Sequence, residues 1–382
     1  MTLAYLRLLF ALQVVDIHSR VFQKFFNSYA SYLKLPFLWL GDGHLAVMGF
    51  FVMSGYLVGL ISQKDKSLLH FSFTRYLRIY PLYWFVLIFY FLVFLHYHMF
   101  GKYMLPFPSV FVVLLNITLL PAVINFFDIN QTRVFWQLYL VPTWTLTFDV
   151  LLYPFGFILM RYLRLAIPVI ISMLGLLYVF ATFHQPHVFI QTSQHSFFFD
   201  YMYSLPAFMF LPFFVGILLF KFKEHIPLKK PLFVGAFLVY LYLCYFPAFL
   251  PSLFVGYVLG LLSLSYIIVY VAKNGKSKYE SLIANYTYSL YLVHYPIIVY
   301  FFRSDRIVGV LVSVVVALIF LIPETFFENL RHKLKPSDKE TNKKILIGLG
   351  IFFVLLFVLS NLFFSALMPV FVKSYVKRYI ER

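Results

Sequence analysis

Ionisable side chains within long apolar runs are the residues of this sequence best suited to chemistry. His18 closes the first such run, in LQVVDIHSR, and Asp149 lies in the middle of a later one, in PTWTLTFDVLLYP. In hydrocarbon, an Asp, Lys or Arg at mid-helix costs ~2.5–3.5 kcal/mol on insertion scales, so such residues are functional candidates by default. Imidazole accepts and returns a proton near neutral pH, which makes His18 a candidate general base. The alternative is an interfacial histidine hydrogen-bonded at a helix end.

Asp149 and His294 are the other ionisable residues that could take part in chemistry with His18. Asp149 offers a carboxylate that either orients His18 or binds an acceptor hydroxyl, and its alternative role is a hydrogen bond that only joins two helices. His294, in YTYSLYLVHYPII, is a site residue or a structural histidine. Asp16 lies two residues before His18, about 200° around a helix, so the two side chains cannot face each other on one helix.

Arg75 and Arg78, in FTRYLRIYPLYW, lie just before an apolar run. Their i, i+3 spacing places both guanidinium groups on one helix face. Paired guanidiniums suit the bidentate binding of phosphates, whereas an ordinary basic anchor at the membrane surface is the alternative. The segment Gly43–Gly59 is rich in small residues, which favours close helix packing. Within it, Ser54 could place a hydroxyl beside a substrate.

The elements that must position these residues are membrane helices. Hydrophobic residues make up 62% of the 382 residues and charged residues 12%, with a mean hydropathy of +0.87. A soluble domain has about 25% charged residues. A hydrocarbon core of ~30 Å needs ~20 apolar residues per helical span, and runs of this kind recur along the chain. The composition excludes a water-soluble fold and predicts an all-α polytopic membrane protein.

The formal net charge of +17 arises from Lys and Arg that crowd some short loops between apolar runs. This distribution is typical of the positive-inside rule and not of a nucleic-acid-binding surface. The single cysteine, Cys244, lies in an apolar run, so the sequence offers no disulfide framework, metal cluster or redox pair. We therefore expect no nucleic-acid partner, no metal and no permanently bound cofactor.

Twelve apolar runs are candidate spans, near 3–18, 44–62, 80–99, 109–126, 139–159, 165–182, 201–220, 231–248, 251–271, 285–302, 307–323 and 345–368. Polar residues and Pro121 interrupt the run at 109–126, so we expect that run to be re-entrant or interfacial. About eleven transmembrane helices remain, with a cytoplasmic N-terminus. In this arrangement the cytoplasmic loops hold nineteen Lys and Arg, and the segments outside hold eleven. The cytoplasmic loops are 63–79, 160–164, 221–230, 272–284 and 324–344. A twelve-span arrangement with both termini outside has the same balance and differs by placing Arg75 and Arg78 outside.

Five motifs in this order resemble acyltransferase family 3. In chain order they are YLRLLFALQVVDIHS with His18; GHLAVMGFFVMSGYLVG with Phe50, Phe51, Ser54 and Gly55; Arg75 and Arg78 followed by Pro81 and Tyr83; Trp144, Thr145, Leu146, Asp149 and Tyr153; and Ser289, Tyr291, Leu292, His294 and Pro296. The fourth motif departs from the family pattern at Thr145, where Ser is usual, and at Asp149, where Glu is usual. The closing Glu of the family has no clean counterpart in PETFFENL, so neither Glu324 nor Glu328 receives a role.

The resemblance implies a family 3-like membrane domain at 1–335, with a ten-helix core and the RxxR motif on the cytoplasmic side. This favours the eleven-span arrangement. A cytoplasmic linker at 336–344 and an extra transmembrane helix with a short basic tail at 345–382 would follow. The implied activity is transfer of an acyl group, commonly acetyl, from acyl-CoA to a hydroxyl of a carbohydrate, glycolipid or cell-envelope glycan. The implied location is the bacterial cytoplasmic membrane.

The resemblance also implies roles for single residues. Arg75 and Arg78 would hold the phosphates of acyl-CoA, and His18 would act as general base, with a covalent acyl-histidine relay left open. Asp149 would orient His18 or the acceptor. The residues expected to contact the substrate are Ser54, Trp144, Tyr153, Tyr291 and His294.

Two other functional classes stay open at this point. A secondary transporter, or a flippase for a lipid-linked sugar, would share the composition but typically shows discontinuous helices in two related halves, and the sequence has no such halves. A non-catalytic partner in polysaccharide export would tolerate substitution of His18, Arg75 and Arg78. Turnover of acyl-CoA discriminates an enzyme from both. The sequence leaves the acceptor, the acyl chain length and the oligomeric state open.

Overall fold

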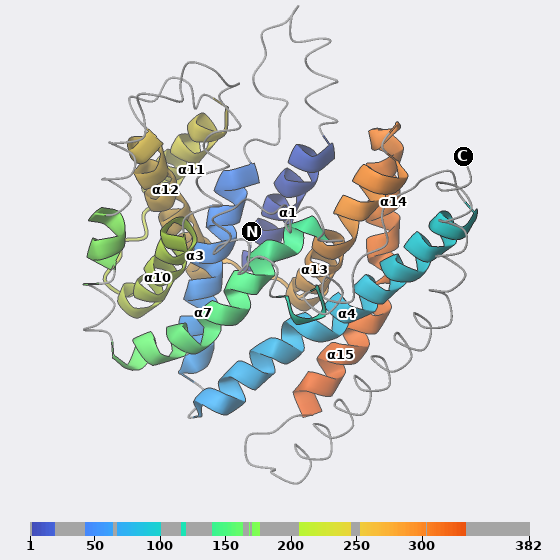
Figure 1. Ribbon diagram of the computed structural model, residues 1–382. Coiled ribbons are helices and arrows are strands. Elements are labelled where there is room, and N and C mark those ends of the chain that lie inside the picture. Colours follow the sequence, from blue (N-terminus) through green and yellow to red (C-terminus); the bar gives the residue numbers. More distant parts are fainter. Residues whose placement is uncertain are drawn as a thin grey trace, which may run out of the picture.

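The computed structural model describes residues 2–19, 43–63, 67–100, 116–119, 140–162, 168, 170–175, 206–245, 253–302 and 304–333. Every regular element within these residues is a helix, and the helices pack side by side as one bundle (Figure 1). The all-α fold class is therefore confirmed for the described part of the chain. The expected linker at 336–344 and the expected spans at 345–368, most of 109–126 and most of 165–182 lie outside these residues.

The elements follow the predicted apolar runs closely. In chain order they are α1 (Leu3–Ser19), α3 (Gly43–Ser62), α4 (Leu68–Phe100), the 3₁₀ turn η3 (Val141–Thr143), α7 (Trp144–Arg161), α10 (Pro206–Phe222), α11 (Lys230–Tyr245), α12 (Leu253–Asn274), α13 (Glu280–Pro296), the π-helical turn η5 (Ile297–Phe301), α14 (Arg306–Ile319) and α15 (Leu321–Lys333). Continuous apolarity is thus a good guide to helix position in this chain.

Three stretches of described helix are long and apolar enough to cross a membrane: Leu45–Ser62, Val255–Asn274 and Arg306–Lys333. Two shorter apolar helices, Phe210–Phe222 and Lys230–Cys244, accompany them. Together with the composition, these helices make the chain a polytopic helical membrane protein. The number of eleven spans stays a prediction.

Small residues allow α3 and α10 to pack backbone against backbone. A Cβ added at Gly55 of α3 would collide with the carbonyl oxygen of Phe213, and one added at Gly216 of α10 would collide with the carbonyl oxygen of Val52. Helices in lipid associate through such close van der Waals contacts. The packing role predicted for the glycine-rich segment is therefore confirmed, and the contact holds the neighbouring Ser54 in place.

Helix α13 links the parts of the bundle that hold the candidate site residues. It packs against α1, α4, α14 and α15, while α1 also packs against α3, and α3 against α7. Figure 1 shows α13 close to α1, α4 and α14. Side chains from segments far apart in the sequence therefore meet along α13.

The structure departs from the predicted loops at two places, each close to a proline. Helix α4 has 33 residues and runs through Pro81, so Arg75 and Arg78 lie within a helix and not in a loop at 63–79. At 1.5 Å per residue α4 is about 50 Å long, more than one ~30 Å span requires. The loop expected to begin at 324 is wrong in its first part, because α15 continues to Lys333. Pro323 lacks the N–H that would bond Ile319, which accounts for the break between α14 and α15.

Candidate active site

Two imidazoles from opposite ends of the sequence meet between α1 and α13. His18 Nδ1 lies 3.0 Å from His294 Nε2, and the ring of Tyr295 meets the His18 ring edge-on, with centroids 4.9 Å apart. His18 is half-buried, whereas His294 is fully buried and its Nδ1 lies 3.1 Å from the carbonyl oxygen of Leu290. The Arg306 guanidinium donates to the Ser19 carbonyl at 3.1 Å and so holds the end of α1 that carries His18.

The Asp149 carboxylate bonds Ser54 and not His18. The Ser54 hydroxyl donates to Asp149 Oδ2 at 3.3 Å, joining α3 to α7. The other oxygen, Oδ1, is buried and has no hydrogen-bond donor among the described residues. Arg7 of α1 lies within electrostatic range of Asp149. The structure therefore places Asp149 beside Ser54, with one carboxylate oxygen that has no hydrogen-bond partner among the described residues.

Aromatic and hydroxyl side chains connect α7 to α13. Tyr291 OH lies 2.6 Å from Thr145 Oγ1 and also donates to the carbonyl oxygen of Pro142. Trp144 is buried and packs edge-on against Phe148, with ring centroids 6.0 Å apart. Thr145, which departs from the family pattern, thus supplies the same hydroxyl chemistry as the usual Ser.

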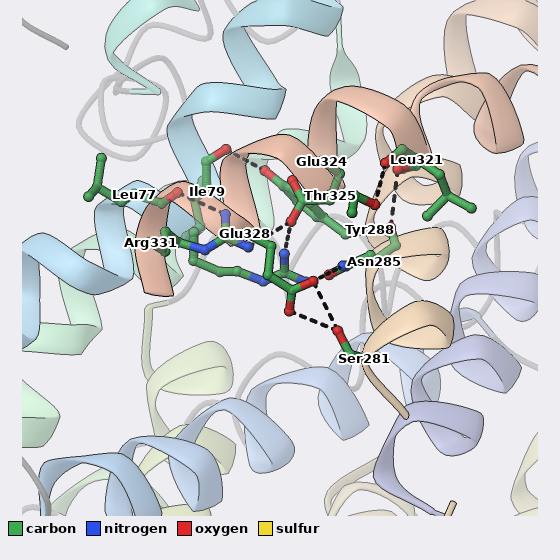
Figure 2. A network of polar contacts seen from close by, with 12 residues as sticks. Leu77, Ile79, Ser281, Asn285, Tyr288, Leu321, Glu324, Thr325, Glu328 and Arg331 are labelled. Atoms are coloured by element: carbon green, nitrogen blue, oxygen red, sulfur yellow. Dashed lines mark hydrogen bonds and ion pairs between the residues drawn. The ribbon is translucent and has the colours of Figure 1, made fainter. Parts of the chain in front are cut away.

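A buried carboxylate joins two arginines at the other end of α13 (Figure 2). Glu324 Oε1 forms an ion pair with Arg78 Nη1 and accepts a hydrogen bond from Arg331 Nη2 at 3.0 Å. The Glu324 side chain is fully buried, while those of Arg78 and Arg331 are 24% and 14% exposed. Since a buried charge persists only when paired, the position of Glu324 is set by these two cations.

The same cluster compensates for a missing helix bond. Pro81 has no N–H, so the Leu77 carbonyl loses its usual partner within α4. Arg331 Nη1 donates to that carbonyl at 3.2 Å, and Figure 2 shows Arg331 directed towards Leu77. In lipid, an unsatisfied carbonyl costs several kcal/mol, so Arg331 stabilises α4 where the helix passes its proline.

A second carboxylate and an aromatic ring complete this cluster, which we call the Glu324 network (Arg78, Ser281, Asn285, Tyr288, Glu324, Glu328 and Arg331). Glu328 accepts from Asn285 at 2.5 Å and from Ser281 at 2.8 Å. Tyr288 OH donates to the Ile79 carbonyl at 2.6 Å, and the Arg78 guanidinium carbon lies 5.5 Å from the centre of the Tyr288 ring.

Tyr153 of α7 lies near several charged residues. Its hydroxyl is within electrostatic range of Arg75 and Arg78, and also of Asp149 and Arg7. The structure therefore brings Tyr153 into the vicinity of both the arginine pair and the carboxylate.

Sequence reasoning missed three charged residues of this region. PETFFENL does not fit the family pattern, so the motifs give Glu324 no role. The apolar runs place Arg331 in a loop, as one of its basic charges. The motifs assign Arg7 no place in the candidate site. The signal for Arg7 was present, because it is an ionisable residue within the first apolar run. Nothing local distinguishes Glu324 from Glu328, four residues later, since only the tertiary contacts make one of them fully buried.

Comparison with known families decides the identity. Residues 2–323 match the family model described as an acyltransferase domain, of acyltransferase family 3. The chain belongs to acyltransferase family 3. The resemblance inferred from the five motifs is therefore confirmed, and so is acyltransferase activity as the general function. Neither the curated proteins nor the solved structures gave a match to the chain.

The family match includes every residue that the motifs singled out, from His18 to His294, and ends at Pro323. Glu324 and Arg331 lie just beyond it. The two imidazoles thus belong to the part of this acyltransferase that the family shares, whereas the Glu324 network combines the shared Arg78 with partners that follow the matched region.

Proposed function

We propose that this acyltransferase transfers an acyl group, commonly acetyl, from acyl-CoA to a hydroxyl of a carbohydrate or cell-envelope glycan. The location proposed is the bacterial cytoplasmic membrane, with the N-terminus in the cytoplasm. The observation that carries the proposal is the pairing of half-buried His18 with His294 in a chain that contains the family domain.

His18 serves as the general base. As the acceptor oxygen attacks the thioester carbonyl, the hydroxyl proton passes to His18. The tetrahedral intermediate then collapses, the C–S bond breaks, and the thiolate of coenzyme A receives the proton from His18. Protons and electrons balance, because the products are an ester and a free thiol. General base catalysis of this kind contributes typically ~10²–10⁴-fold.

The arginine pair supports binding of the phosphates of acyl-CoA, and its two members are not equivalent. Arg78 is already bound to Glu324, so part of its charge is neutralised before a donor arrives. Arg75 is half-buried in the same helix, one turn earlier. Arg78 is therefore held in a fixed orientation by Glu324, one helical turn from Arg75.

Asp149 is proposed to orient the acceptor through a hydroxyl other than the reacting one. Asp149 Oδ1 has no hydrogen-bond donor among the described residues. A hydrogen bond from a hydroxyl to a charged carboxylate contributes ~1.5–3 kcal/mol. Ser54 holds the other oxygen. Trp144, Tyr153 and Tyr291 supply aromatic surface suited to the faces of sugar rings.

Purified protein given acyl-CoA and a hydroxyl acceptor tests this proposal. His18→Ala is expected to lower kcat by ~10²–10⁴-fold, while the matched control His225→Ala, at an exposed loop position, keeps wild-type turnover. A folded His18→Ala protein with undiminished transfer rules out His18 as the base. The acceptor class is tested by mass spectrometry of cell-envelope glycans with and without the gene, where the expected result is loss of an acetyl increment.

A further inference from the structure

We propose that His294 is a positioning residue that fixes the tautomer of His18, so that the lone pair of the His18 ring lies on Nε2. The inference rests on the proposed function, in which His18 accepts the proton of the acceptor hydroxyl. In this inference the partner of His294 is His18 and not the substrate.

The first step is the hydrogen bond between His294 and its own helix. His294 Nδ1 lies 3.1 Å from the carbonyl oxygen of Leu290, one turn earlier in α13. A carbonyl oxygen only accepts, so Nδ1 must carry the hydrogen. In a neutral imidazole the other nitrogen is then an acceptor, which places the lone pair of His294 on Nε2.

The second step is that His294 stays neutral. Its side chain is completely buried, and no carboxylate of the described residues lies within ion-pair distance of it. An unpaired charge at such a position is strongly disfavoured. The described surroundings of the ring therefore disfavour a charged His294, which would donate from Nε2.

The third step transfers this constraint to His18. His294 Nε2 lies 3.0 Å from His18 Nδ1. Since Nε2 is the acceptor, His18 Nδ1 must be the donor, and the lone pair of the His18 ring then lies on Nε2. When His18 takes up a proton, the same bond becomes a charge-assisted one, and such bonds are shorter and roughly twice as strong.

The helix around His294 is built to hold its ring still. Tyr90 OH donates to the Val293 carbonyl at 2.6 Å, and the chain changes to a π-helical turn directly after Pro296. Single π-helical turns occur frequently at functional sites. Residues that orient a reacting group must themselves be locked by packing and hydrogen bonds, and His294 meets that requirement.

Two amide variants separate the hydrogen bonds of His294, because the side chain of glutamine is one methylene longer than that of asparagine. In His294→Gln the amide oxygen reaches the position of Nε2 and can still accept from His18, whereas in His294→Asn the amide reaches only the position of Nδ1. We expect His294→Asn to lower kcat by ~10–100-fold, the loss typical for partners that orient a functional histidine, with KM for acyl-CoA unchanged. His294→Gln is expected to keep kcat within about threefold, because it retains the orienting bond.

The tautomer itself can be measured by solid-state NMR on ¹⁵N-histidine-labelled protein in lipid, with the His18 signals assigned from the spectrum of His18→Ala. The expected wild-type result is a protonated Nδ1 and an unprotonated Nε2 in His18. In His294→Asn the two tautomers are expected to mix. A wild-type His18 with its proton on Nε2 overturns the inference, as does an unchanged His18 spectrum in folded His294→Asn.

This measurement separates the two proposals. If His18→Ala retains full transfer while the wild-type tautomer is as expected, the general-base role fails and the positioning by His294 stands. If His18→Ala is inactive but the wild-type proton lies on Nε2, the general-base role stands and the positioning fails.

Discussion

Helix α13 carries two polar clusters that differ in charge and in number of contacts. At one end His294 makes one bond to His18 and one to its own helix. At the other end Ser281, Asn285 and Tyr288 belong to the Glu324 network, which contains four charged side chains. Asn285 and His294 are nine positions apart, which corresponds to about 14 Å along the helix axis.

The difference follows from what each cluster must do in a low-dielectric interior. Charged groups are tolerated there only when paired, so Glu324, Arg78 and Arg331 occupy one another. Neutral imidazoles carry no charge that must be paired, and they can accept and return a proton near neutral pH. The charged cluster is therefore suited to fixing structure, and the imidazole pair to proton transfer.

The largest effect on stability is expected from Glu324→Leu. The substitution leaves Arg78 and Arg331 side by side without their shared counter-charge, and removal of one partner from a buried ion pair costs ~3–5 kcal/mol. Thermal unfolding in detergent, followed by tryptophan fluorescence, should show a markedly lower midpoint. The matched control is Glu328→Gln in the same helix, which keeps an acceptor for Asn285 and should lose less. An unchanged midpoint for Glu324→Leu would show that the two ends of α13 do not differ as described.

A smaller effect separates the two arginines. Arg75→Ala is expected to raise KM for acyl-CoA by roughly 10–100-fold, the equivalent of ~1.5–3 kcal/mol for a hydrogen bond to a charged group. Arg78→Ala should raise KM less and lower the unfolding temperature more, because Arg78 also pairs with Glu324. Initial rates at varied acyl-CoA, together with unfolding midpoints, test the contrast. Identical behaviour of the two variants would contradict it.

The smallest effect is expected at an exposed ion pair. Lys273 Nζ lies 2.5 Å from Glu224 Oε2, with side chains 30% and 66% exposed. The hydrogen bond from Lys273 holds the pKa of Glu224 below its ordinary value. A lowered pKa contributes stability above the ordinary pKa that is lost as the pH falls through the lowered one. Water and salt screen such pairs, so Glu224→Gln should lower the unfolding midpoint at neutral pH only slightly. A shift as large as that of Glu324→Leu would refute the distinction between buried and exposed pairs.

The sequence alone determined the class of the molecule and the types of its reactive groups. Unbroken apolarity located the helices, because a membrane span must satisfy its backbone internally. Ionisable residues within those runs identified His18, Asp149 and His294, since hydrocarbon makes such residues exceptional. The order of five motifs identified the family, which the match over residues 2–323 confirmed.

Only the tertiary structure decided which of these groups meet. His18 and His294 are separated by 276 positions. Arg78 of α4 and Glu324 of α15 are also far apart in the sequence. Helical periodicity tells which residues share a face of one helix, but the partner of that face depends on how the whole bundle packs. For this reason the sequence leaves open whether Asp149 orients His18 or the acceptor, and the structure places its carboxylate beside Ser54. The burial of Glu324 between two arginines likewise has no signal in its own segment.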